Sequence, residues 1–124
     1  MGVLVMAPTQ LYKADGGKPR PTLLEKDFVH ALRAVQATLD YGAQKYEARS
    51  WKRVERERYD DAARRHRIAL DMGSLRDPES NLLHRAHQII CELMILEGEI
   101  EQLLEADSSF DYTTFNKPPL DHKK

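Results

Sequence analysis

The sequence predicts an all-α fold, a helical bundle of three principal helices. Apolar residues recur every three or four positions in three separate segments, which is the spacing of one helical face. Helix-boundary signals, such as Gly73 and the pair Asp77-Pro78, separate the second and third segments. No alternating apolar and polar pattern longer than a few residues indicates a strand. With 124 residues, the chain is long enough for one domain.

An extended basic arm is expected over residues 1–21, where three of the six prolines and the pair Gly16-Gly17 fall. The arm carries two cations, Lys18 and Arg20. They are either solvated charges on a flexible terminus or a basic flap that closes over phosphates.

The first helix is expected to begin at Thr22, at the start of a helical domain over residues 22–106. In the stretch TLLE, the Thr22 hydroxyl can accept from the amide of Glu25, and Glu25 can reach back, as in a capping box. Gly42 is expected to interrupt the helix. The apolar face that follows the cap consists of Phe28, Leu32, Val35 and Leu39.

The second helix is expected over about residues 54–72, and Gly73 suits the left-handed position after its end. Its alanines would let another helix approach closely, and His66 shares their face. Arginines and lysines gather over residues 49–67, but acidic residues interrupt them. This mixture is typical of a solvated helix face, so we expect no stable nucleic-acid partner.

The third helix is expected to start at DPES, with Asp77 as its N-cap and Pro78 at the first helical position. Its apolar face continues to about Ala106, with Gly98 as a weak point within it. Residues 107–124 have no period. We expect them to fray or to wrap around a neighbouring subunit.

The composition excludes several classes of protein. The net charge of −1, with 31% charged residues, gives no reason to expect wholesale binding to nucleic acid or membranes. No signal segment or membrane span is evident, and the single cysteine, Cys91, fits a reducing compartment. A cytoplasmic protein is therefore expected. Because three helices give a thin core, we also expect a homo-oligomer, a dimer or a tetramer.

Three side chains of the third helix, His84, His87 and Cys91, fall on nearly one stripe. The histidines could hold a metal ion, or they could border the core as hydrogen-bonded side chains. Cys91 is expected to be a small buried hydrophobe. His66 could approach His84 or His87 across a helix contact.

Several acidic and aromatic residues can also be interpreted in two ways, as structural or as functional residues. Asp77 and Glu79 are either a cap and a first-turn acid, or oxygen ligands for Mg²⁺ or Mn²⁺. Asp61 forms an i,i+4 pair with Arg65, which could alone explain both residues. Trp51 is a core or interface aromatic by default, but it could also stack on a base.

Six motifs in one order resemble those of the phage dATP/dGTP diphosphohydrolase family, which is similar to the all-α MazG-like nucleotide pyrophosphohydrolases. They are KPRP, YGAQKY, SW, YDDAARRH, DPES and HRAH, and the resemblance covers roughly residues 16–97. It implies removal of pyrophosphate from purine deoxynucleoside triphosphates with Mg²⁺ or Mn²⁺. For a phage protein, this activity would shape the nucleotide pool in the host cytoplasm.

The resemblance matches these motifs by position, and the roles that follow are our hypothesis for the implied hydrolysis. Metal ligands are expected at Asp77 and Glu79, with Asp61 or Glu92 as a further ligand. His84, His87 and His66 are expected to be catalytic, ligating metal or relaying a proton from water. Substrate-binding residues are expected at Lys18, Arg20, Lys45, Tyr46, Trp51 and Arg65, with the cations on phosphates and Trp51 or Tyr46 against the purine.

The sequence also departs from the family pattern. Ala34 stands where relatives often carry glutamate, Gly73-Ser74 replaces a Gly-Glu pair, and Asn81 replaces the glycine after DPES. The paired E-x-x-E and E-x-x-D motif of MazG-like enzymes is absent as such. Two alternatives therefore stay open: a catalytically inactive nucleotide-binding or interaction module, and a transition-metal-binding protein that uses its histidines.

Overall fold

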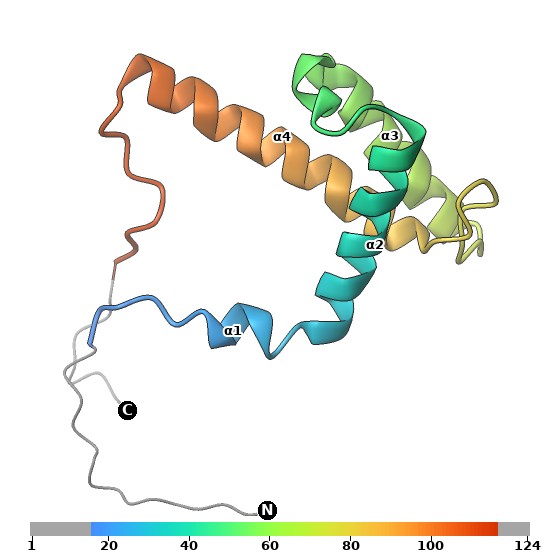
Figure 1. Ribbon diagram of the computed structural model, residues 1–124, viewed down its shortest axis with the longest axis horizontal. Helices are drawn as coiled ribbons and strands as arrows, with labels where there is room; N and C mark the ends of the chain where they lie inside the picture. Colours follow the sequence, from blue (N-terminus) through green and yellow to red (C-terminus); the bar gives the residue numbers. More distant parts are fainter. Residues whose placement is uncertain (1–15, 117–124) are drawn as a thin grey trace, which may run out of the picture.

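The structure, a computed structural model, describes residues 16–116, and this part of the chain is helical (Figure 1). It contains no strand, only an isolated bridge between Arg76 and Leu83. The all-α bundle of three principal helices is therefore confirmed. The first 15 residues of the expected arm and residues 117–124 of the expected tail lie outside the described residues. The elements are α1 (Thr22–Glu25), α2 (Val29–Lys45), the 3-10 helix η2 (Ser50–Arg53), α3 (Arg56–Asp71) and α4 (His84–Ala106).

Helix α4 is the centre of the bundle, and α3 packs along it more extensively than α2 does (Figure 1). The two helices α3 and α4 run antiparallel, because the start of α3 meets the later part of α4. Arg56 forms an ion pair with Glu99 at 2.6 Å. At the other end of this contact, His66 meets His84. The loop between α3 and α4 therefore lies beside the histidines.

The core is thin and lies mainly between α3 and α4. Ala63 and Ala86 are 2% and 3% exposed, and such small side chains allow the two helix backbones to approach closely. Cys91 is buried, as expected. The remaining buried apolar side chains are Ile90 and Ile95.

The first helix differs from the expectation at its start. The capping box does not form, because Thr22 already lies inside the first turn, and Pro21 occupies the N-cap without a side-chain hydrogen bond. The helix also breaks after Glu25. Phe28, at the N-cap of α2, has a non-helical backbone, so α1 is a separate single turn.

Gly42 does not interrupt α2, which was expected to break there. The helix continues to Lys45, and the Gly42 carbonyl accepts a hydrogen bond from the Tyr46 N–H at 2.8 Å. A glycine inside a helix costs only about 1 kcal/mol relative to alanine, which packing of α2 against α4 can offset.

The start of the third helix is also corrected. Helix α4 begins at His84, and the DPES motif forms a turn before it. The Asp77 carboxylate does accept the Ser80 N–H at 2.9 Å, as a cap would. The chain then enters the left-handed region at Asn81, with φ 63°, so the turn cannot continue into the helix.

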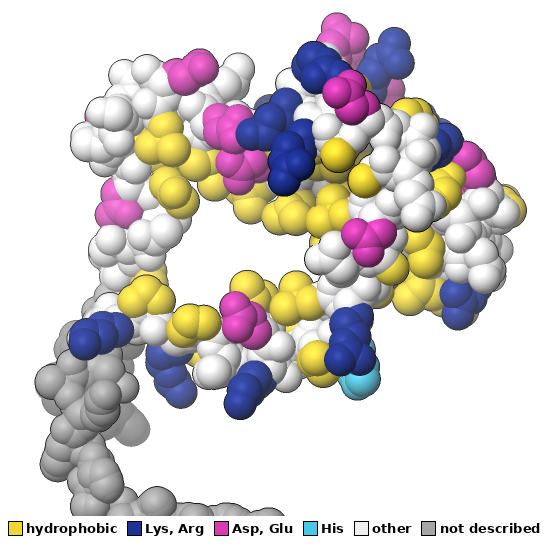
Figure 2. Space-filling view, in the orientation of Figure 1, with side chains coloured by type: hydrophobic (Ala, Val, Ile, Leu, Met, Phe, Trp, Pro, Cys, Tyr) yellow, Lys and Arg dark blue, Asp and Glu magenta, His cyan; other side chains and the backbone are white. Residues whose placement is uncertain are grey.

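Two apolar surfaces face one another across an opening in the molecule (Figure 2). One belongs to α1 and the start of α2 and the other to the later part of α4. We call them the α1–α2 arm and the α4 arm. The exposed large hydrophobics of the first are Leu23, Leu24, Phe28 and Val29, and those of the second are Leu93, Leu96 and Leu103.

No helix in the described range combines the length and the apolar character that crossing a membrane requires.

Candidate functional site

Three histidines meet at the end of the α3–α4 contact. Nδ1 of His66 lies 2.9 Å from Nδ1 of His84. The rings of His66 and His87 are stacked, with their centroids 4.7 Å apart. The predicted approach of His66 to His84 and His87 across a helix contact is therefore confirmed.

The loop between α3 and α4 adds oxygen atoms to this cluster. Asp77 Oδ2 lies 3.9 Å from His87 Nε2, and Ser80 Oγ lies 2.8 Å from the same nitrogen. One ligand atom each from His66, Asp77 and His84 lies within 4.8 Å of the other two. We call His66, Asp77, Ser80, His84 and His87 the histidine cluster.

The loop holds this shape because it satisfies its own hydrogen-bonding groups. The Asp77 N–H donates to the carbonyl of Leu82 at 2.8 Å, and the Asn81 N–H donates to the carbonyl of Asp77 at 2.7 Å. The Arg76 guanidinium donates to the Asn81 carbonyl at 2.9 Å. Asn81 suits its positive φ, because asparagine tolerates the left-handed region better than most residues.

Burial lowers the pKa of His66 and His87 below the usual 6.5 of imidazole, so both rings are mainly neutral at neutral pH. Burial alone would raise the pKa of Asp77, but hydrogen bonds from Ser80 and the nearby histidines bring it below its ordinary value. The site therefore combines neutral imidazoles with an ionised carboxylate, a combination suited to accepting protons or binding a cation.

One edge of the site is formed by the end of α2. Lys45 forms an ion pair with Glu79, and this contact raises the pKa of Lys45 and lowers that of Glu79. The Tyr41 ring stands edge-on to His87, with the centroids 6.0 Å apart. The Lys45 ammonium also lies 5.2 Å from the ring centroid of Tyr46. Lys45 and Tyr41 of the YGAQKY motif thus lie beside Glu79, and Tyr46 lies beside Lys45.

Other predicted residues do not join the cluster. Asp61 and Glu92 are exposed and lie outside the group of metal-capable atoms found in the described residues. Arg65 is also exposed, although its charge contributes to the low pKa of His66. The expected Asp61–Arg65 pair is not among the ion pairs of the described residues. Instead, Arg64 pairs with Asp60 at 3.4 Å.

Lys18 and Arg20 are exposed in the segment before α1, and nothing in the structure brings them to the histidines.

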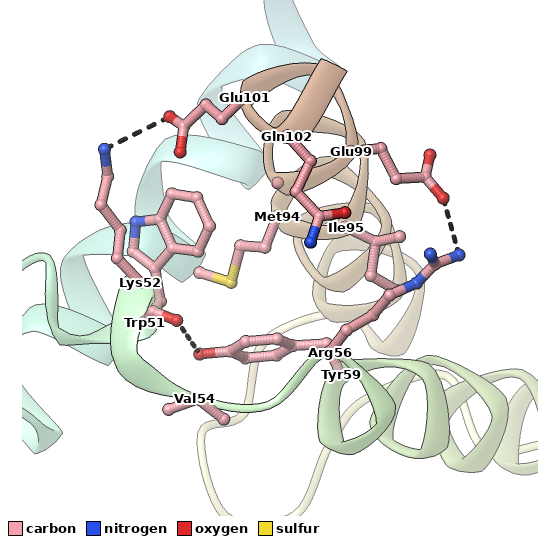
Figure 3. Close-up of a pocket in the computed structure, with 11 residues that line it drawn as sticks. Trp51, Lys52, Val54, Arg56, Tyr59, Met94, Ile95, Glu99, Glu101 and Gln102 are labelled. Atoms are coloured by element: carbon pink, nitrogen blue, oxygen red, sulfur yellow. Dashed lines mark hydrogen bonds and ion pairs between the residues drawn. The ribbon is translucent and has the colours of Figure 1, made fainter. Parts of the chain in front are cut away.

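Trp51 lies in a separate cavity of about 250 Å³ between η2, the start of α3 and the later part of α4 (Figure 3). The Tyr59 hydroxyl donates to the Trp51 carbonyl at 3.1 Å, and Lys52 lies 3.4 Å from Glu101 at the rim. Gly98, which also lines the cavity, follows His87 by eleven residues on α4. At about 1.5 Å per residue, that is roughly 16 Å along the helix.

The sequence interpretation missed one contact of the site. Ser74 Oγ lies 3.1 Å from His84 Nε2 and also donates to the Arg76 carbonyl at 3.3 Å. The sequence did draw attention to this position, because Ser74 stands where relatives often have glutamate. Ser80 and Tyr41 were recognised only as parts of motifs. Their neighbours could not be inferred before the loop conformation was known.

Comparison with models of protein families gives a match over most of the chain. The family model described as dATP/dGTP diphosphohydrolase, N-terminal, matches residues 8–108, which include the histidine cluster and Lys45. Comparisons with curated proteins and with solved structures give no significant match. The match covers most of the sequence, and the chain therefore belongs to the dATP/dGTP diphosphohydrolase N-terminal family.

Proposed function

We propose that the protein hydrolyses dATP and dGTP to the monophosphate and pyrophosphate with a divalent metal, Mg²⁺ or Mn²⁺. The observation that carries the proposal is the histidine cluster. Neutral imidazoles surround the ionised Asp77 beside Lys45, in a chain of a family named for this activity. Family membership alone would not identify the groups that react.

The neutral histidines are suited to the proton transfer that hydrolysis requires. Water must lose a proton as its oxygen bonds to the α-phosphorus and the bond to pyrophosphate breaks. An imidazole with a lowered pKa is free to accept that proton at neutral pH. His87 is the best placed base, because Ser80 Oγ fixes its ring through Nε2 at 2.8 Å, with the Asp77 carboxylate 3.9 Å from the same atom. Cys91 is not a nucleophile, since burial raises its pKa to about 11.

The loop carboxylates and the nearby cations suit a triphosphate. Asp77 and Glu79 offer the oxygen atoms that Mg²⁺ and Mn²⁺ prefer. When bound, such an ion would offset phosphate charge and lower the pKa of water. Lys45 is held beside the loop by Glu79 and would turn to the phosphates as they enter. Arg65, which directly precedes His66 on α3, would add a second charge.

The purine is expected to stack near the cluster rather than in the Trp51 cavity. Tyr46 is 61% exposed and lies next to Lys45. Trp51 is on η2, and its cavity is lined by the later part of α4, whereas the histidine cluster is at the start of α4. Charged pairs, such as Lys52 with Glu101, stand at the rim of this cavity (Figure 3). Of the two predicted aromatics, Tyr46 is therefore the better placed for a nucleotide whose phosphates reach the histidines.

A second copy of the chain would cover the α1–α2 arm and the α4 arm. Their side chains are large, apolar and unpartnered within the described residues, with Leu24 57% and Leu96 51% exposed. Soluble monomers rarely expose such contiguous surfaces. We therefore propose a homo-oligomer, a dimer or a tetramer, that buries both arms.

The test is to incubate the full chain with dATP or dGTP and Mg²⁺ or Mn²⁺, and to separate the products by anion exchange. The expected products are the monophosphate and pyrophosphate. His87→Gln should lose most of the activity, whereas His30→Gln, an exposed histidine on α2, should keep it.

Two outcomes would reject this function. Deoxynucleoside plus tripolyphosphate would identify a triphosphohydrolase. Calorimetric binding of dGTP without turnover in either metal would favour the alternative, an inactive nucleotide-binding module.

A further inference from the structure

We propose that His66, Asp77 and His84 bind one divalent transition-metal ion, from Mn²⁺ to Zn²⁺, in preference to Mg²⁺. For its catalytic meaning this inference rests on the proposed function, but metal binding itself can be measured without nucleotide. The ligand set expected from the sequence was led by carboxylates, with the histidines as further ligands or as proton relays. Here two imidazole nitrogens would join one carboxylate.

The distances suit a single ion. Bonds from zinc to nitrogen or oxygen are about 2.0–2.2 Å, so neighbouring ligand atoms lie about 3.0–3.4 Å apart and opposite ones about 4.2 Å. The two Nδ1 atoms of His66 and His84 are 2.9 Å apart, and all three ligand atoms lie within 4.8 Å of one another. Small side-chain movements would place all three around one position.

The hydrogen bonds of Ser74 prepare His84 to be a ligand. The hydroxyl of Ser74 has one proton, which it donates to the Arg76 carbonyl at 3.3 Å. It therefore accepts from Nε2–H of His84, 3.1 Å away. This leaves the Nδ1 lone pair of His84 directed at His66. An imidazole ligand whose other nitrogen donates to an oxygen is the usual arrangement at metal centres.

Asp77 has oxygen lone pairs left for an ion after its contact with the loop. Its Oδ2 atom accepts the Ser80 N–H at 2.9 Å, and the carboxylate is partly exposed, with a relative side-chain exposure of 20%. His87 has a different position. Its Nε2 atom is held by Ser80 Oγ at 2.8 Å and its ring stacks on His66. His87 would therefore stand beside the ion without binding it.

The donor types decide which ion is preferred. Imidazole suits Zn²⁺, Fe²⁺, Ni²⁺ and Cu²⁺, whereas Mg²⁺ favours oxygen ligands and dehydrates reluctantly. Three protein ligands from α3, the loop and α4 leave coordination positions open, as in catalytic zinc sites. Those positions could take water and phosphate oxygens.

The experiment uses the metal-free full chain, titrated with ZnCl₂, CoCl₂, MnCl₂ or MgCl₂ in a calorimeter, with visible absorption spectra for cobalt. We expect one equivalent of Zn²⁺ or Co²⁺, and Mg²⁺ binding at least about 100-fold weaker. His66→Gln and Asp77→Asn should each weaken Zn²⁺ binding by about 100-fold or more. His30→Gln should bind like the unaltered chain, since His30 is exposed on α2.

His66 and Asp77 are partly exposed, so both variants are expected to fold, which circular dichroism can confirm. His84→Ala is less suitable, because it removes a buried side chain. The inference is overturned if no ion binds stoichiometrically, if Mg²⁺ binds as tightly as Zn²⁺, or if folded His66→Gln and Asp77→Asn keep full affinity. Metal binding at this site without nucleotide hydrolysis would reject the hydrolase proposal alone. Mg²⁺-dependent hydrolysis that survives His66→Gln would reject the metal assignment alone.

Discussion

Lys45 and Glu79 form an ion pair that joins the end of α2 to the loop before α4. Because this pair is partly exposed, it contributes little to stability. Lys45 lies at the edge of the histidine cluster and is paired with a loop carboxylate, so we expect it to matter for substrate binding.

We predict that Lys45→Gln raises KM for dATP and dGTP by roughly tenfold, because one charge on the phosphates is lost. The melting temperature should change little. Arg53→Gln is the matched control, since Arg53 forms an exposed pair with Glu47 away from the cluster. Steady-state kinetics and thermal melts measure both effects. An unchanged KM in Lys45→Gln would contradict the role of this lysine.

The aromatic residue that contacts the purine can be identified by two variants. Tyr46→Ala should raise KM for dGTP several-fold, because base stacking contributes about 1–3 kcal/mol. Trp51→Phe should leave KM unchanged, because Trp51 lies in the separate cavity (Figure 3). For the same reason, dGTP should barely alter the fluorescence of Trp51, the single tryptophan. Strong quenching by dGTP would instead place the base in that cavity.

The metal-free protein should lose stability as the pH falls below about 6.5. In the unfolded chain His66 and His87 take up protons near their ordinary pKa of 6.5, but in the folded chain burial lowers both pKa values. Protons therefore bind the unfolded state first, and the stability present above pH 6.5 is lost through the acidic window. The pKa of Asp77 is lowered from 3.8, so protonation of this carboxylate causes a further loss of folding stability below pH 3.8.

Melting temperatures measured between pH 8 and pH 5 with a chelator would test this. His66→Gln and His87→Gln should each show a smaller fall, and His30→Gln should follow the unaltered chain. A melting temperature that rises on acidification would contradict the predicted loss of stability at low pH.

The apolar arms should mediate self-association. Leu96→Glu introduces a charge into the α4 arm and should shift the protein toward the monomer in analytical ultracentrifugation. Met72→Glu is the control, because Met72 is 82% exposed at the end of α3, outside both arms. If the unaltered chain sediments as a monomer, the proposed oligomer is wrong.

Asn81 tests the backbone of the loop. Asn81→Gly should be tolerated, because glycine adopts the φ of 63° without a steric penalty. Asn81→Val should lower the free energy of unfolding by about 1–2 kcal/mol, since a β-branched residue is unfavourable in the left-handed region. Urea denaturation measures both values. Equal stability of the two variants would mean that the loop does not require this conformation.

The sequence was informative where periodicity and spacing decide the outcome. As expected from the helical spacing, His66 on the second helix lies against His84 and His87. Gly73 follows α3 in the left-handed region, with φ 94°, which was also expected. Such features follow from local geometry and from burial of one helix face.

The sequence was less informative where tertiary packing or side-chain hydrogen bonds compete with local preference. Asp77-Pro78 has every sign of a helix start, yet Asn81 turns the chain away and α4 begins later. Packing also allows α2 to continue past Gly42 without a break. The exposure of Asp61 and Glu92 could not be anticipated either, because no periodic pattern distinguishes a ligand from a solvated acid.

His66 and His84 are separated by only 18 positions along the chain, on adjacent antiparallel helices. Contacts between near neighbours in sequence form rapidly during folding, whereas docking of a more distant segment closes a longer loop. The α3–α4 hairpin can therefore gather its imidazoles before α2 arrives. If α2 packs after the hairpin has formed, Lys45 would reach a histidine cluster that is already in place.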